Sequence, residues 1–99
     1  MSYNIIFDPK VGEDLKRLRK YDQTAILDTI ERSLTSMPTQ EQGTRIKALE
    51  QPAFSQFRLR VGEFRVYYDV DEENQEVYIF RVREKGRRTT LEVTEDENH

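Results

Sequence analysis

The sequence predicts an α+β fold with an N-terminal strand, a two-helix hairpin and an antiparallel three-strand meander. In the first third of the 99 residues, apolar side chains recur every three or four positions, whereas from residue 57 they alternate with polar ones. The period changes after a polar stretch, residues 37–44, that contains a proline and a glycine and reads as a connector. A chain of this length has room for a single domain, which we expect over residues 1–91, followed by an acidic, mobile tail at 92–99.

The first elements are expected to be a short strand and two amphipathic helices. Residues 3–7 are β-branched and aromatic, and Asp8 and Pro9 then provide an N-cap and a proline at the first helical position. A helix is predicted over residues 9–20, and a second one, capped by Asp22, is predicted to end before Pro38. Their apolar stripes are Val11, Leu15 and Leu18 in the first helix, and Ile26, Leu27, Ile30 and Leu34 in the second. We expect both stripes to face the core.

The meander is predicted from strict alternation. Residues 57–61 place three apolar side chains on one face and two arginines on the other, and Gly62 begins a two-residue turn. Residues 64–70 alternate again and place Arg65 and Tyr67 on the same face as the earlier arginines. An acidic turn at 71–76 leads to a third strand at 77–82, which is apolar on both faces at its start and is therefore expected to be central. A basic loop, residues 83–88, follows.

Composition excludes several kinds of chemistry. The chain has no cysteine and its single histidine is the last residue, so thiolate sites, disulfides and ordinary histidine catalysis are not expected, nor is a metal or another cofactor. It has no apolar run long enough for a membrane span and no basic-then-apolar leader, so we expect a cytoplasmic protein without membrane contact. The net charge of −3 argues against simple nucleic-acid binding. The acidic side chains, however, concentrate in the turn at 69–76 and in the tail.

The outward face of the meander is the expected functional surface. Arg58, Arg60 and Arg65 lie on it with Tyr67, and the basic loop ends beside it. Guanidinium groups bind phosphate bidentately and stay charged. The ring of Tyr67, and that of Tyr78 or Phe80 nearby, can stack on unpaired bases. A phosphate-rich ligand or an acidic protein segment is the natural partner. The alternative is a solvated face whose arginine stems cover apolar surface.

The order of these motifs resembles the RelE/ParE toxin superfamily. The resemblance is carried by Lys47-Ala48-Leu49 and by the stretch 57–71, in which an aromatic-Arg-Leu-Arg strand, a glycine turn and an aromatic-Arg-Val-x-Tyr strand follow a helical hairpin. It covers residues 3–88 and implies a RelE-like microbial RNase fold. It also implies a toxin of a type II toxin–antitoxin system that cleaves mRNA on the ribosome without a metal, through attack of the RNA 2′-hydroxyl on the adjacent phosphate.

The resemblance implies roles for the basic residues. The expected catalytic residues are Arg65, Arg58, Lys85 and Arg87, with Arg65 on the scissile phosphate; those expected to bind RNA are Lys47, Arg60, Tyr67, Arg83 and Arg88. A shift of two residues in the match would give the role of Lys85 to Arg83 or Arg87. The implied partners are a cognate antitoxin, the ribosome with its mRNA, and operator DNA through the antitoxin complex alone.

One departure from the superfamily leaves other functions open. RelE-like RNases end their motif with a Tyr or a His-Tyr pair, where this chain has Leu91. Without that residue, the chain is either a weakened non-catalytic binding module or a ParE-like inhibitor of DNA gyrase without nuclease activity. Alternatively, Tyr67 supplies the aromatic ring of the missing tyrosine. Glu84 is a candidate proton acceptor, although a carboxylate in a basic loop is more often an ion-pair partner.

Overall fold

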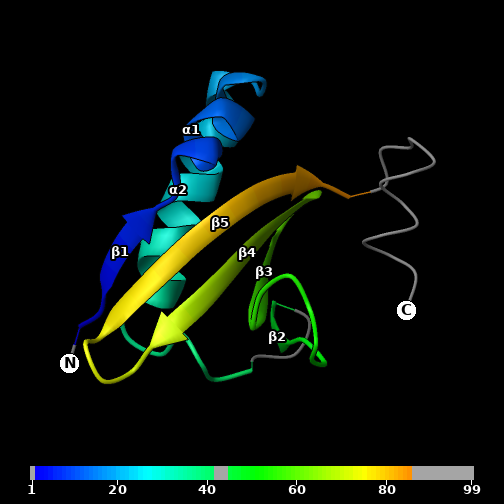
Figure 1. The fold of residues 1–99 in the computed structure, drawn as a ribbon. Helices are drawn as coiled ribbons and strands as arrows, with labels where there is room; N and C mark the ends of the chain where they lie inside the picture. Colours follow the sequence, from blue (N-terminus) through cyan, green and yellow to red (C-terminus); the bar gives the residue numbers. More distant parts are fainter. Residues whose placement is uncertain (1, 42–44, 86–99) are drawn as a thin grey trace.

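The computed structural model describes residues 2–41 and 45–85, which form a twisted sheet with two helices on one side (Figure 1). In chain order the elements are β1 (Asn4–Phe7), α1 (Pro9–Lys16), α2 (Lys20–Leu34), β2 (Ile46–Ala48), β3 (Phe57–Val61), β4 (Phe64–Asp71) and β5 (Glu76–Glu84). The α+β class, the N-terminal strand, the helical hairpin and the meander are confirmed. The predicted tail at 92–99 lies outside the described residues.

The helix α1 begins as predicted and ends earlier. The Asp8 carboxylate accepts a hydrogen bond from the backbone N–H of Lys10 at 2.9 Å, and Pro9 occupies the first turn. The helix ends at Lys16 rather than at residue 20. The chain then turns through a hydrogen bond from the N–H of Leu18 to the carbonyl of Leu15, at 2.9 Å.

The prediction that Asp22 caps the second helix is wrong. The helix α2 begins at Lys20 with Arg19 at its N-cap, and Asp22 lies inside the first turn. There its carboxylate forms an ion pair with Arg19, with Oδ2 3.7 Å from Nε. The physical reason is that a carboxylate is favourable anywhere in the first turn, since that end of the helix carries partial positive charge.

In the part of the chain that the structure describes, the sheet has five strands in the order β1-β5-β4-β3-β2. The meander β3-β4-β5 is antiparallel, and β1 adds in parallel to β5, so that β5 is an interior strand as expected. The short strand β2 pairs antiparallel with β3 and was not expected from the sequence. The strand β5 is also longer than predicted, because Arg83 and Glu84 extend it instead of starting a loop.

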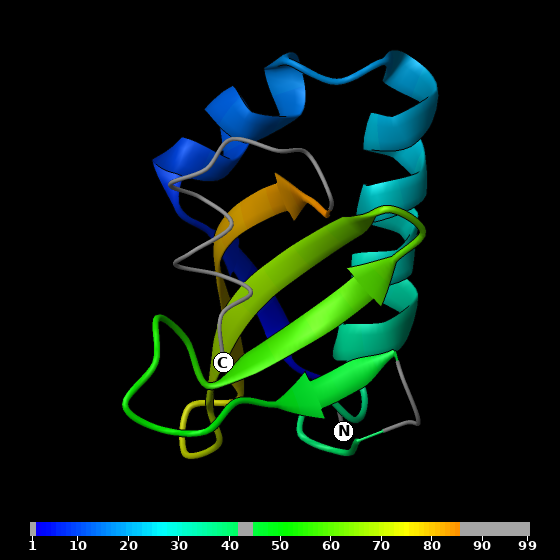
Figure 2. The same cartoon turned by 90° about the vertical axis from the view of Figure 1, so that its right-hand side faces the viewer.

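The core lies between the helices and one face of the sheet (Figures 1 and 2). Its fully buried side chains come from both helices and from every strand except β1: Val11, Ile26, Ile30, Leu34, Ile46, Leu59, Val66, Tyr68, Val77 and Ile79. The ring of Tyr68 stacks on Phe57 with centroids 5.5 Å apart, and its hydroxyl donates to the carbonyl of Pro38 at 2.7 Å. No helix of the described ranges is long and apolar enough to cross a membrane.

Candidate functional site

Three arginines stand side by side on the sheet face that points away from the helices. Arg60 of β3 is the register partner of Arg65 of β4, which is in turn the register partner of Arg83 of β5. Neighbouring strands are about 4.8 Å apart, so the three residues form one line across the sheet. This line, called the arginine row below, brings three positively charged side chains together on one face of the sheet.

A second line of basic residues runs beside the arginine row. Lys47 of β2 pairs with Arg58 of β3, and Arg58 pairs with Tyr67 of β4. Two residues along a strand correspond to about 7 Å, so this line lies one such step from the arginine row. The strand register therefore places four predicted residues on one face of the sheet: Arg58, Arg60, Arg65 and Tyr67.

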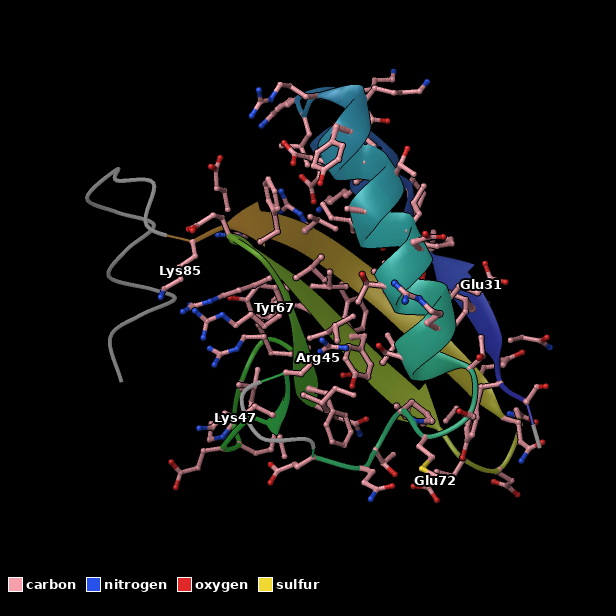
Figure 3. All side chains as sticks on the ribbon, turned by 180° about the vertical axis from the view of Figure 1, so that it is seen from behind. Glu31, Arg45, Lys47, Tyr67, Glu72 and Lys85 are labelled. Carbon is pink, nitrogen blue, oxygen red and sulfur yellow. The ribbon has the colours of Figure 1, made fainter. Side chains whose placement is uncertain are left out.

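Two more cations flank the arginine row at its ends. The carbonyl of Arg45 accepts a hydrogen bond from the N–H of Arg60 at 2.7 Å, and the N–H of Lys85 donates to the carbonyl of Glu63 at 2.6 Å. In Figure 3, Lys85, Tyr67 and Lys47 lie toward one side of the molecule, away from Glu31 and Glu72. We call the following seven residues the basic face: Arg45, Lys47, Arg58, Arg60, Arg65, Arg83 and Lys85.

Arg65 lies deeper in this surface than the sequence indicates. It is 8% exposed, because it sits in the middle of the arginine row with Arg60 on one side and Arg83 on the other. A guanidinium shielded from water attracts an anion more strongly than an exposed one. Arg65 is the most buried cation of the arginine row.

Tyr67 lies on the expected face, and its ring is covered. The residue is 5% exposed, and the ring of Phe54 stands edge-on to it with centroids 5.8 Å apart. The expectation that Tyr67 stacks on a base is therefore not supported by its position. Phe54 is 58% exposed and was missed, because it belongs to the aperiodic segment between β2 and β3, where hydrophobic periodicity carries no signal.

Asp14 is a second residue that the sequence did not single out. Its carboxylate accepts hydrogen bonds from Nε and Nη2 of Arg81 and from the N–H of Val82, each at 2.9 Å. Burial raises the pKa of the Asp14 carboxyl, but the hydrogen bonds from Arg81 and Val82 outweigh it and hold that pKa below 3.8. The charge of Arg81 is thereby neutralised.

The remaining predicted residues do not extend the site. Glu84 is the register partner of the core residue Phe64, so its position alternates away from the arginine row, and this favours its interpretation as an ion-pair partner. Arg87 and Arg88 lie outside the described residues. Within residues 2–41 and 45–85 no group of three or more His, Cys, Asp or Glu side chains could hold a metal ion.

Comparison with known proteins identifies relatives of this fold. A family model described as the ParE toxin of the type II toxin–antitoxin system parDE matches residues 5–89. None of the curated protein sequences matches the chain significantly.

Solved structures of toxins share the architecture. The toxin–antitoxin complex RelBE2 from Mycobacterium tuberculosis contains a chain that superposes with a TM-score of 0.71 at 24% identity, covering 86% of this chain and 100% of that one. For the archaeal RelE–RelB complex from Pyrococcus horikoshii the TM-score is 0.59 at 21% identity, covering 89% and 100%. The YoeB dimer from Staphylococcus aureus gives 0.55 at 22% identity, covering 84% and 97%. At these identities the likeness establishes the fold.

Proposed function

The chain belongs to the ParE toxin family of type II toxin–antitoxin systems, within the RelE/ParE superfamily, and we propose that it is a ribosome-dependent mRNA endonuclease that inhibits translation. The observation that carries the proposal is the arginine row. It places three guanidinium groups on one face of the sheet, and because guanidinium groups bind phosphate oxygens through bidentate hydrogen bonds, a phosphodiester backbone is a ligand of matching charge.

The proposed reaction needs no metal ion. The 2′-hydroxyl oxygen of the RNA attacks the adjacent phosphorus and loses its proton, and the bond from phosphorus to the 5′-oxygen of the next nucleotide breaks. The products are a 2′,3′-cyclic phosphate and a 5′-hydroxyl, which takes up a proton. Negative charge grows on the phosphoryl oxygens in the transition state, so cations fixed beforehand around the phosphorus lower the barrier.

The arginine row supplies such cations from three strands. In the proposal Arg65 binds the scissile phosphate, and Arg60 and Arg83 hold it from either side. Lys85 follows β5, two residues beyond Arg83, and so stands on the same face, where it would stabilise the departing oxygen. Arg58 and Lys47, in the second line, would position the neighbouring backbone. Arg87 and Arg88 remain candidates for the same roles.

The proposed partners follow from this activity and from the relatives. Two of the similar structures are complexes of a toxin with its antitoxin, and we propose that an antitoxin likewise neutralises this chain and that operator DNA is bound through that complex. The proposed site of action is the cytoplasm, where the ribosome presents mRNA.

The proposal is tested in a translating cell extract. Adding the protein should produce cuts inside the reading frame, and Arg65→Ala should lower their rate by about 10²–10³-fold, the usual effect of removing one preorganised contact to a developing anion. Arg32→Ala is the matched control, because Arg32 is exposed on α2, across the molecule from the basic face. Intact mRNA and normal protein synthesis with the wild-type protein would refute the proposal.

Inhibition of DNA gyrase is the second candidate function. It is favoured by Leu91, which stands where RelE-like RNases have a tyrosine, and by the match to the ParE model. A supercoiling assay separates the two functions. Inhibited supercoiling together with undisturbed translation would select the gyrase inhibitor, and the reverse result would select the endonuclease.

A further inference from the structure

Four aromatic side chains lie together at the margin of the basic face. The ring of Phe54 has its centroid 5.8 Å from that of Tyr67 and 5.9 Å from that of Phe80, and Phe80 in turn lies 5.0 Å from Tyr78. The three contacts are edge-on or tilted, which are favourable arrangements for aromatic pairs. The rings therefore form one continuous cluster across β4, β5 and the segment that precedes β3.

The cluster exposes apolar surface to water. Phe54 is 58% exposed and Tyr78 is 37% exposed, whereas Tyr67 is buried beneath Phe54. Exposed aromatic area costs free energy in proportion to its size, and adjoining exposed rings mark a surface that is covered when a ligand binds.

A β-bulge in β5 positions the ring of Phe80. Tyr67 pairs with Arg81 while Tyr68 pairs with Ile79, so Phe80 is an extra residue in β5, a β-bulge. Bulges re-aim side chains, and here Phe80 comes within ring contact of Phe54 instead of taking an ordinary ladder position.

The segment that carries Phe54 is held in place by its neighbours. The N–H of Gln56 donates to the carboxylate of Asp69 at 2.6 Å, and the side-chain oxygen of Gln56 accepts from the N–H of Val70 at 2.9 Å. On the other side, the hydroxyl of Ser55 donates to the carbonyl of Phe57 at 3.0 Å. Because the segment is pinned to β3 and β4, little conformational freedom remains to be lost when Phe54 contacts a ligand.

We propose that Phe54, Phe80 and Tyr78 form a platform on which one unpaired nucleobase of a bound RNA stacks. The inference rests on the proposed function for the nature of the nucleic acid. It adds the place where a base is held and a residue, Phe54, that no motif indicates.

Charge decides between a nucleobase and an apolar protein segment as the occupant. Tyr67, the ring beneath Phe54, is the register partner of Arg58, and the arginine row lies one two-residue step away. A phosphate on the basic face thus brings its own base within reach of the rings. Stacking on aromatic side chains beside a cationic track is how single-stranded nucleic acids are held without sequence readout.

The platform is tested by equilibrium binding of the full-length protein to a short fluorescein-labelled oligoadenylate, in wild type and variants. Phe54→Ala should weaken binding by about 10- to 100-fold, the effect of losing one base stack, while Phe54→Tyr should bind as wild type does. Tyr21→Ala is the matched control, because Tyr21 is an exposed aromatic residue on α2. The salt dependence of binding should keep its slope in Phe54→Ala and become shallower by about one unit in Lys47→Ala.

A second probe reports the stacking directly. With 2-aminopurine at the centre of the same oligonucleotide, binding to wild type should quench its fluorescence, and binding to Phe54→Ala at saturating protein should not. If Phe54→Ala binds and quenches as wild type does, the platform is overturned while the endonuclease proposal stands. If the wild-type protein does not bind the oligonucleotide, the platform is overturned, whereas the endonuclease proposal fails only if mRNA stays intact in the translating extract. If Phe54→Ala loses affinity for the antitoxin and keeps it for RNA, the rings hold a protein segment instead.

Discussion

Removing the side chain of Asp14 should cost the fold about 3 kcal/mol of stability. Asp14 is 8% exposed, and Asp14→Ala would leave the guanidinium of Arg81 and the N–H of Val82 without their acceptor. Removing one partner of a buried ion pair costs about 3–5 kcal/mol. Because the side chain of Arg81 is 28% exposed, water can solvate its guanidinium once Asp14 is removed. We therefore expect a loss of about 3 kcal/mol, at the low end of this range. For a domain of this size the loss corresponds to a fall in Tm of roughly 12–24 °C.

The contribution of Asp14 to the free energy of unfolding decreases at acidic pH. The folded-state pKa of Asp14 is lowered below its usual 3.8, so its contribution is fully present above the pKa of the unfolded chain. It is lost as the pH falls through the lower folded-state pKa. The difference in unfolding free energy between wild type and Asp14→Ala should therefore be constant near neutrality and shrink below about pH 4.

Urea unfolding followed by circular dichroism measures both quantities. Asp28→Ala is the control, since Asp28 is an exposed carboxylate on α2 and its loss should change stability by less than about 0.5 kcal/mol. The double variant Asp14→Ala/Arg81→Ala should lose less than the sum of the two single variants, because the partners act as a unit. If Asp14→Ala unfolds with the same midpoint as Asp28→Ala, the reasoning is wrong.

Three further predictions concern the fold, and urea unfolding checks each of them. Ile46→Ala should cost about 2–5 kcal/mol, because Ile46 is fully buried although β2 is only three residues long. Gly62→Ala should destabilise by about 1–2 kcal/mol, since Gly62 has φ +57°, whereas Gly12→Ala should stabilise by about 0.5–1 kcal/mol, since Gly12 lies within α1 with open space around its Cα. Burial raises the pKa of Tyr68 above its usual 10.0, so stability should fall as the pH rises past 10 in wild type and less so in Tyr68→Phe. Equal stability of the two glycine variants, or matching alkaline profiles for Tyr68→Phe and wild type, would contradict these expectations.

Periodicity was sufficient to predict most of the fold and two of the three residues of the arginine row, whereas Arg83 was expected in a loop and lies in β5. Strict alternation over 57–61 and 64–70 placed Arg60 and Arg65 on one face, and the two-residue turn at Gly62 fixed which residues oppose each other. The strand β2 was not predicted, because its three residues are too few to show a period and Ile46 is its only buried position. Its strand character comes from pairing with β3.

The depth of each side chain could not be predicted in the same way. Alternation assigns a face, but Tyr67 is buried on the outward face because Phe54, from a segment without a period, closes over it. The bulge at Phe80 is set by how β4 and β5 pair, and the contact of Asp14 with Arg81 joins elements far apart in the chain. Long-range geometry of this kind leaves no local pattern in a single sequence.

The parallel pairing of β1 with β5 has a consequence for how the protein is made. Asn4 is paired with Glu76 and Phe7 with Ile79, so β1 has no partner until the chain has been synthesised as far as residue 79. Arg83, which completes the arginine row, is translated later still. Such non-local contacts form late, after the loop between them has been closed. During its own translation the nascent chain therefore lacks the complete basic face until β5 has emerged from the ribosome.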